Sequence, residues 1–238
     1  MKYFDPIRKV GSQKEIPSFT EFDNFIKVEG YQSFLINKIS GKLDFLSHKK
    51  KCQKLDLIFK SINDCKSILD LGCNSGVALF IAKQNNFTFC TGVDHDPECI
   101  DILNQIISKL NLALSINAHT LNIGDNKLKE KIKNKYDLVY CGALIHWIFS
   151  LTSDFRNFNS LISYLSYFSK NRLIIEWVDP EDSVIKKFNH ISKNSLPNDE
   201  IYNIDNFERN LSKFGNIEEK IIMEKETRIS YICNLKKG

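Results

Sequence analysis

Along most of the chain, short apolar runs alternate with longer segments in which apolar residues recur every three or four positions. Short apolar runs bounded by polar residues predict buried strands, and a 3.6-residue period predicts amphipathic helices. Strands are expected at residues 67–71, 87–93, 114–123, 136–141 and 171–178, and helices at residues 76–85, 96–110, 127–133 and 155–168. The pattern therefore predicts an α/β fold.

The end of the chain breaks this alternation. Residues 217–223 and 229–235 are two strand-like runs joined by the short polar turn 224–228. A hairpin here adds an antiparallel strand, whereas strands that alternate with helices favour right-handed βαβ units and a parallel sheet covered on both faces. We therefore expect a Rossmann-like, mostly parallel seven-stranded sheet with a C-terminal antiparallel hairpin.

Residues 1–62 carry none of this alternation. Aromatic and aliphatic residues stand at mixed spacing over residues 25–46, and residues 55–62 have helical periodicity. We expect an N-terminal helical cap over residues 1–62 and the α/β domain over residues 63–238. The segment 28–34 mixes a glycine with polar and aromatic residues, which fits a lid over a substrate or a helix that merely packs.

Composition narrows the protein class. Hydrophobic residues make up 42% and charged residues 26% of the 238 positions, proportions that favour a folded globular protein over disordered, collagen-like or coiled-coil chains. No apolar run approaches the roughly 20 residues of a membrane span, and the N-terminus lacks a signal-peptide stretch. We therefore expect a cytoplasmic protein without a membrane span.

Charge and cysteine content point to no special class. The net charge of +4 comes from 33 basic and 29 acidic residues, which neither demands nor excludes a nucleic-acid partner. The seven cysteines are an odd number without a CxxC pair, so neither a disulfide framework nor a zinc ribbon fits. Most of them are expected to be small buried hydrophobic residues.

The most specific motif is the run ILDLGCNSG at residues 68–76, in which an apolar strand enters a tight glycine turn before a helix. Gly72 allows close approach of the backbone to a ligand, and Gly76 lets the helix start near the strand. The next strand ends at Asp94, 22 positions after Gly72. In this topology a carboxylate there accepts hydrogen bonds from ribose hydroxyls.

A dinucleotide dehydrogenase uses similar architecture, but two features favour another cofactor. The loop is GxxxG and lacks the G-x-G-x-x-G arrangement that presents a helix N-terminus to a pyrophosphate. Asp70 is unfavourable near a diphosphate, whereas it suits a ligand with an ammonium group and a cationic sulfur. The cofactor with those two groups is S-adenosylmethionine.

The motif LDLGCNSG resembles the first motif of class I S-adenosylmethionine-dependent methyltransferases, and the resemblance covers about residues 63–235. It implies that residues 63–238 form the cofactor-binding methyltransferase domain. The implied cofactor contacts are Asp70, Gly72 and Cys73 at the methionine end, Gly76 shaping the loop, Asp94 at the ribose, His95 and Asp125 at the adenine, and Cys141 at the reactive face.

Two absences narrow the chemistry. The strand 136–141 is followed by Gly142-Ala143-Leu144. Enzymes that methylate amino groups of bases resemble one another in an Asn/Asp-Pro-Pro-aromatic tetrapeptide at this place, and this chain lacks it. Metal-assisted catechol-type enzymes have an aspartate at this strand end, where this chain has Cys141. We therefore expect no catalytic metal and no base N-methylation.

Two residues are candidates for catalysis. His146 follows the fourth strand at the expected mouth of the cleft, where an imidazole could take a proton from an attacking hydroxyl; it could equally be a structural histidine. Glu176 lies at the end of the fifth strand, where ligands bind in open α/β folds, and could orient the substrate. The nearby residues Asp179, Glu181 and Asp182 are expected to cap the following helix.

The acceptor is less defined than the cofactor. A weaker resemblance to methyltransferases of bacterial surface-polysaccharide biosynthesis implies metal-independent O-methylation of a small molecule, such as a sugar, a nucleotide-linked intermediate, a capsular polysaccharide precursor or its phosphoramidate group. Alternatives are an RNA or protein methyltransferase, or a catalytically silent cofactor-binding partner subunit. Basic stretches at residues 48–51, 127–135 and 236–237 fit solvated surface better than a nucleic-acid site.

Overall fold

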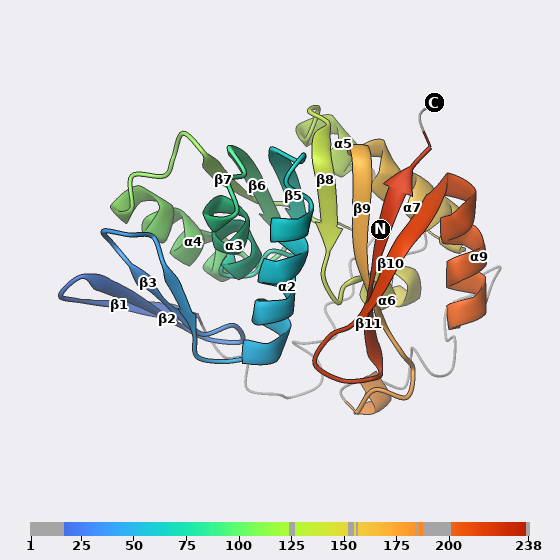
Figure 1. Ribbon diagram of the computed structural model, residues 1–238, viewed down its shortest axis with the longest axis horizontal. Coiled ribbons are helices and arrows are strands. Elements are labelled where there is room, and N and C mark those ends of the chain that lie inside the picture. Colours follow the sequence, from blue (N-terminus) through green and yellow to red (C-terminus); the bar gives the residue numbers. More distant parts are fainter. Residues whose placement is uncertain are drawn as a thin grey trace. The chain divides into compact units, whose positions relative to one another are not determined.

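The computed structural model describes residues 17–123, 127–151, 155, 157–183, 185–187 and 201–236. The chain divides into two compact units, residues 1–121 and 122–238, and Figure 1 shows the helices and strands of each. Within the described residues, the two units contribute three and four strands to a mostly parallel seven-stranded sheet with a C-terminal antiparallel hairpin. The predicted Rossmann-like α/β fold is confirmed.

The N-terminal part of the first unit is not the expected helical cap, because it forms a separate antiparallel sheet. Its strands are β1 (Ser18–Phe22), β2 (Phe25–Glu29), β3 (Phe34–Asn37) and β4 (Leu43–Phe45), each paired with the next. Alternation explains the outcome: Ile26 and Val28 are buried while their neighbours in β2 are partly exposed, which is the two-residue period of a half-buried strand. These strands are too short for the alternation to be recognised in the sequence.

The helical prediction holds only at the end of this region, where α2 spans Lys49–Ser61. The segment 28–34 is not a packing helix: it comprises the end of β2, the connection 30–33 and the first residue of β3. Gly30 adopts a φ of 138°, and its N–H donates to Ser33 Oγ at 3.2 Å. A substrate-covering role for this connection stays a prediction.

Three parallel strands in the order β5 (Ser67–Leu71), β6 (Phe89–Asp94) and β7 (Ile116–Thr120) form the rest of the first unit's sheet. The helices α3 (Val77–Gln84) and α4 (Pro97–Lys109) connect them. The α4 helix begins at a proline, and the carboxylate of Asp96 before it accepts the N–H of Glu98 at 3.1 Å. These are standard start signals for a helix, and each element lies within a few residues of its predicted position.

In the second unit, β8 (Tyr136–Cys141) pairs in parallel with β9 (Ser169–Val178). The hairpin of β10 (Gly215–Ile222) and β11 (Arg228–Leu235) follows, with β11 antiparallel to β9. The helical elements are α5 (Lys127–Lys131), α6 (Ile145–Leu151), α7 (Phe158–Tyr167), η1 (Ile185–Lys187) and α9 (Ile204–Phe214). The sequence pattern identified α5, α7 and the hairpin but not α6 or α9.

One face of β9 is covered by aromatic side chains. The indole of Trp177 stacks on Tyr202 with ring centroids 4.4 Å apart and on Phe207 at 5.2 Å, and Phe149 of α6 stacks on Phe158 at 4.5 Å. Aromatic contacts of this kind bury large apolar areas. Since side chains alternate along a strand, Glu176 lies on the opposite face of β9 from Trp177.

The loop after β9 departs from the predicted helix caps. The carboxylate of Asp182 is fully buried and accepts from Arg228 Nε at 3.0 Å and from Thr227 Oγ1 at 2.8 Å. It therefore fastens this loop to the β10–β11 turn, because the charged guanidinium is a stronger partner than a helix N–H. Asp179 does accept a nearby backbone N–H, that of Glu181, at 2.8 Å.

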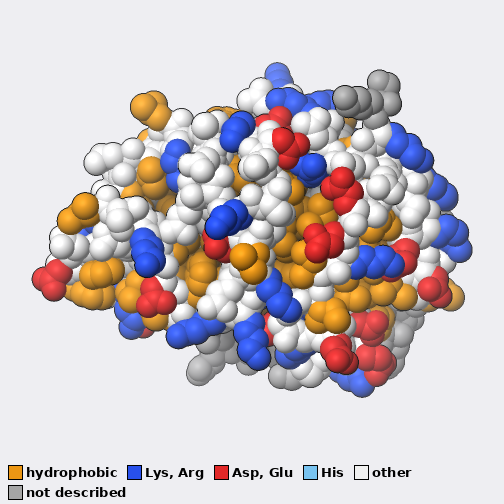
Figure 2. Space-filling model, in the orientation of Figure 1, with side chains coloured by type: hydrophobic (Ala, Val, Ile, Leu, Met, Phe, Trp, Pro, Cys, Tyr) orange, Lys and Arg blue, Asp and Glu red, His pale blue; other side chains and the backbone are white. Residues whose placement is uncertain are grey.

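All seven cysteines are buried, as expected for small hydrophobic residues. Among the described residues, no helix has both the length and the apolar character needed to cross a membrane. The face of the protein drawn in Figure 2 intersperses Lys and Arg with Asp and Glu. That mixture agrees with the small net charge of +4.

Candidate functional site

The turn after β5 is held in an unusual backbone conformation. Gly72, Asn74 and Gly76 have φ values of 80°, 49° and 87°, a region that glycine adopts without strain. The N–H groups of Gly72 and Cys73 both donate to Val93 O, at 2.8 and 3.1 Å. The turn is thus fixed to the end of β6.

Glycine is also required at this turn for packing. A Cβ on Gly76 would lie 2.5 Å from Leu103 Cδ1 of α4, and a Cβ on Gly92 would lie 2.7 Å from Cys73 Sγ. Gly92 was part of the predicted strand motif, but the sequence did not reveal that it makes room for the Cys73 side chain. Burial raises the pKa of the Cys73 thiol well above its usual range, so this sulfur is neutral and serves packing.

Asp94 connects the turn to the start of α4. Its Oδ2 accepts the N–H of Asn74 at 2.9 Å, and its Oδ1 accepts the N–H of Asp96 at 3.0 Å. The Nδ1 atom of His95 lies 3.2 Å from the same Oδ1. Each carboxylate oxygen can accept about two hydrogen bonds, so Oδ2 keeps room for a further donor such as a ligand hydroxyl.

Asp70 lies one strand away from this carboxylate, in β5 opposite Gly92 of β6. Its side chain is 2% exposed. Burial, together with the negative charge of Asp94, raises the pKa of Asp70 to about 8, and Lys51 acts in the opposite direction. The carboxyl group therefore holds its proton at neutral pH, and a cation bound beside it would favour the charged form.

Lys51 is the residue that the sequence analysis missed in this unit. It belongs to the basic stretch 48–51, and nothing in its spacing distinguished it from the lysines beside it. The structure buries it to 8% exposure in the first turn of α2, while Lys49 and Lys50 are exposed. Fully buried lysines are rare unless they are paired, and this one acts electrostatically on Asp70.

In the second unit, Cys141 ends β8 with a fully buried side chain. His146 follows in α6 and is 4% exposed, so it lies in the interior of the unit and not at an exposed mouth as expected. The reason is helical: His146 and Phe149 are three residues apart and share a face, and Phe149 stacks in the aromatic cluster.

Glu176 is also interior. The strand β9 continues to Val178, so Glu176 does not end it, and its side chain has no exposed surface. Its neighbour across the sheet is Ser230 of β11, which is equally buried. The predicted strand 171–178 has the same end as β9, so sequence reasoning placed this carboxylate at the open edge although two strand residues follow it.

The predicted site residues thus fall into two groups. The structure brings together Asp70, Gly72, Cys73, Gly76, Asp94 and His95 in the first unit. Cys141, His146 and Glu176 belong to the second unit. Asp125 lies outside the described residues.

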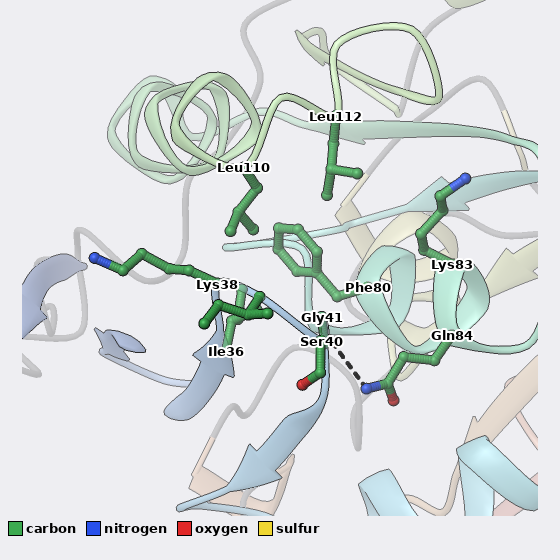
Figure 3. Close-up of a pocket in the computed structure, with 10 residues that line it drawn as sticks. Ile36, Lys38, Ser40, Gly41, Phe80, Lys83, Gln84, Leu110 and Leu112 are labelled. Carbon is green, nitrogen blue, oxygen red and sulfur yellow. Dashed lines mark hydrogen bonds between the residues drawn. The ribbon is translucent and has the colours of Figure 1, made fainter. Parts of the chain in front are cut away.

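A pocket of about 320 Å³ lies elsewhere in the first unit. Figure 3 shows it bordered by Phe80, Leu110 and Leu112, with Lys38 and Lys83 directed away from one another and a hydrogen bond of 3.0 Å from Gln84 Nε2 to the carbonyl oxygen of Gly41. Its α3 residues, Phe80, Lys83 and Gln84, lie between the middle and the C-terminal end of that helix. The glycine turn precedes the other end of α3, so this pocket is separate from the predicted cofactor contacts.

Within the described ranges, no group of three or more His, Cys, Asp or Glu side chains is arranged to hold a metal ion. Metal-independent chemistry stays a prediction.

Comparison with known proteins identifies relatives for most of the chain. A family model described as a methyltransferase domain matches residues 32–215. The ribosomal protein L11 methyltransferase of Dictyoglomus thermophilum is 24% identical over 110 residues, which are 46% of this chain and 34% of that protein. The chain therefore matches about a third of the length of this relative.

Two solved structures share the fold. An O-methyltransferase family protein from Burkholderia thailandensis superposes with a TM-score of 0.57 at 14% identity, over 78% of this chain and 56% of that one. Magnesium protoporphyrin IX methyltransferase from Synechocystis PCC 6803, solved with bound SAH, gives a TM-score of 0.54 at 16% identity, over 79% and 83% of the two chains. Likeness at this identity concerns the fold.

Proposed function

Because this chain belongs to the methyltransferase-domain family, we propose that it is an S-adenosylmethionine-dependent methyltransferase that methylates an oxygen of a small molecule without a metal ion. The observation that carries the cofactor assignment is the glycine turn hydrogen-bonded to Asp94. The magnesium protoporphyrin IX methyltransferase, which has a similar fold, was also solved with bound S-adenosylmethionine (SAM), and this supports the same cofactor here. The proposed acceptor is argued from residues of the second unit.

The residues of the first unit suit the chemistry of this cofactor. Asp94 Oδ2 has acceptor capacity for a ribose hydroxyl, and His95 stands next to it for the adenine. The buried Asp70 suits the ammonium of the methionine end, because a cation relieves the cost of ionising it. Gly72 and Cys73 offer backbone at that end, where Gly76 shapes the turn.

S-adenosylmethionine supplies a methyl group on a positively charged sulfur, so the protein's task is to position an acceptor and manage its proton. We assign the proton to His146, whose side chain is buried in the second unit and would take the proton from an acceptor hydroxyl. Glu176 would orient the acceptor or the imidazole, and Cys141 would border the reactive face. In-line transfer also depends on alignment of the acceptor oxygen.

The proposed acceptor is a small molecule or sugar, such as a nucleotide-linked intermediate, a capsular polysaccharide precursor or its phosphoramidate group. Two features favour oxygen chemistry without a metal: Cys141 stands where catechol-type enzymes have an aspartate, and the base-methylating tetrapeptide is missing after β8. A hydroxyl acceptor needs a base, and His146 provides one.

A second candidate function is methylation of RNA or protein. The ammonium of Lys129 lies 4.7 Å from the ring centre of Tyr167, and that of Lys135 lies 6.0 Å from it; Tyr167 is 43% exposed. Lysines interleaved with an exposed aromatic ring suit single-stranded nucleic acid, a combination that the sequence pattern did not show. Protein methylation is supported by the name of the L11 relative. A silent partner subunit is the remaining alternative.

The test measures S-adenosylhomocysteine released when the protein is incubated with S-adenosylmethionine and, separately, sugar phosphates, nucleotide sugars, RNA or a ribosomal protein fraction. We expect turnover with a sugar-containing acceptor that persists in the presence of a chelator. Turnover only with RNA or protein would replace the acceptor assignment. Cofactor binding without turnover on any acceptor would favour the silent subunit.

His146→Ala should lower kcat on that acceptor by about 100-fold, the contribution expected of a general base, while the dissociation constant for S-adenosylmethionine stays within about twofold. His119→Ala, at an exposed histidine of β7, is the matched control and should retain activity. A His146→Ala enzyme with near-normal kcat and an unchanged melting temperature would make His146 structural.

A further inference from the structure

Lys51 occupies a position that follows from the path of the chain. The α2 helix has 13 residues and rises roughly 20 Å, and β5 has five residues and spans roughly 17 Å. The chain reverses between them, and Figure 1 shows α2 leading into the start of β5. The first turn of α2, with Lys51, is therefore level with the end of β5, where the glycine turn begins.

The burial of Lys51 separates it from the rest of its basic stretch. Lys49 and Lys50 precede it on exposed faces of α2, whereas Lys51 is 8% exposed. An ammonium in the interior needs a nearby negative charge to offset its lost hydration. Two buried carboxylates stand at the glycine turn, those of Asp70 and Asp94, and the charge of Lys51 acts on Asp70.

The amino-acid end of S-adenosylmethionine is a zwitterion with one ammonium and one carboxylate. Asp70 matches the ammonium, but none of the predicted contacts supplies a positive charge for the carboxylate. Lys51 is a buried positive charge that acts on Asp70. Lys51 is therefore suited to the ligand carboxylate, and Asp70 to the ligand ammonium. Charge-assisted hydrogen bonds in a buried setting are the strong ones.

We propose that Lys51 binds the carboxylate of the cofactor's methionine end and thereby distinguishes the complete cofactor from adenosine derivatives that lack this group. The inference rests on the proposed cofactor. Asp70 and Lys51 then act as a pair: one takes the ligand ammonium and the other the ligand carboxylate. In the absence of ligand, each offsets part of the other's desolvation.

The test is a calorimetric cycle with two ligands and two proteins. Wild type and Lys51→Met are titrated with S-adenosylmethionine and with decarboxylated S-adenosylmethionine, which lacks only the carboxylate. Lys51→Met should weaken binding of the complete cofactor by about 10- to 100-fold and leave binding of the decarboxylated form within about threefold. Removing the Lys51 ammonium, removing the ligand carboxylate, or removing both should reduce the binding affinity by about the same factor.

Lys50→Met is the matched control, because it removes an exposed lysine from the same turn of α2, and it should bind both ligands like wild type. Lys51→Arg, which keeps the charge, should recover part of the lost affinity. Circular dichroism and melting temperatures show whether each variant is folded.

Two results would overturn the inference. Equal loss of affinity for both ligands would make Lys51 a structural counter-ion of Asp70, and unchanged binding of S-adenosylmethionine to folded Lys51→Met would remove it from the site. Failure of the wild-type protein to bind either ligand would instead contradict the proposed cofactor, which keeps the two failures distinguishable.

Discussion

Two buried aspartates, one in each unit, are held in opposite ways. In the second unit, Asp182 has no exposed surface and is bonded by the guanidinium of Arg228 and the hydroxyl of Thr227. In the first unit, Asp70 is 2% exposed beside a like charge, Asp94, and its pKa is raised to about 8. The first arrangement closes a loop of the fold, and the second keeps a carboxyl group protonated at neutral pH until a bound cation favours its charged form.

The contrast explains why nearly equal burial can mean different things. A buried carboxylate with charged donors is compensated within the protein, whereas Asp70, beside another carboxylate, is compensated only in part by Lys51. Perturbed carboxyl groups of the second kind are common at functional sites. Three substitutions test whether this division between a structural and a ligand-binding aspartate is correct.

The largest expected effect is on stability. Asp182→Ala leaves the guanidinium of Arg228 buried without its carboxylate, and breaking a buried pair costs about 3–5 kcal/mol. Urea unfolding followed by circular dichroism measures the loss. Affinity for S-adenosylmethionine in the folded protein should stay within about twofold, because Asp182 does not belong to the glycine turn.

Glu181→Ala is the control for this experiment. Its partner Lys186 lies 2.5 Å away, but both side chains are well exposed, so the pair is worth less than about 1 kcal/mol. If the two substitutions destabilise the protein equally, the Asp182–Arg228 pair does not fasten the loop as described.

The next effect is on binding. Asp94→Ala removes an acceptor for a ribose hydroxyl, and a hydrogen bond to a charged group is worth about 1.5–3 kcal/mol. The dissociation constant for S-adenosylmethionine should therefore rise about 10- to 150-fold in calorimetry. Asp101→Ala, which alters an exposed carboxylate of α4, should change nothing. Unchanged affinity in folded Asp94→Ala would remove this residue from the cofactor site.

A third expected effect is on the pH dependence of stability. The folded protein raises the pKa of Asp70 from 3.8 to about 8, so between pH 4 and pH 8 it binds more protons at this group than the unfolded chain does. Stability therefore falls as pH rises through that window. Asp70→Asn cannot ionise and should remove this fall, so its stability relative to wild type should rise between pH 5 and pH 8, by about 3–4 kcal/mol.

Urea unfolding of both proteins at the two pH values measures that difference. The same dependence in Asp70→Asn and in wild type would mean that Asp70 does not carry the unfavourable charge. Asp94→Asn adds a second reading, because removal of the neighbouring charge should lower the pKa of Asp70 and flatten the wild-type dependence in part.

The regular part of the fold was predictable because each element carries a local signal. The strand 67–71 and the strand 136–141 match β5 and β8 residue for residue, since each run follows a lysine and ends before a glycine. The helix α6 was missed because seven residues hold too few periods for the pattern to register. The N-terminal sheet was missed because strands of three to five residues show little more than one alternation.

The candidate site divides in the same way. The glycine turn and Asp94 were identified from sequence because their roles depend on neighbours close in the chain: positive φ at Gly72 and Gly76, and a strand end 22 positions later. Lys51 gave no signal, because lysine is common in this chain and its burial depends on the reversal between α2 and β5.

The sequence by itself determined the α/β class, the cofactor loop and the succession of strands between residues 67 and 235. Periodicity and turn chemistry are properties of short segments. Tertiary structure decided which charges are buried and against what. Asp182 meets Arg228 across 46 positions, Asp70 meets the charge of Lys51 from a preceding helix, and Glu176 becomes interior because β9 extends past it. Such pairings depend on how the chain returns upon itself, and no local pattern records them.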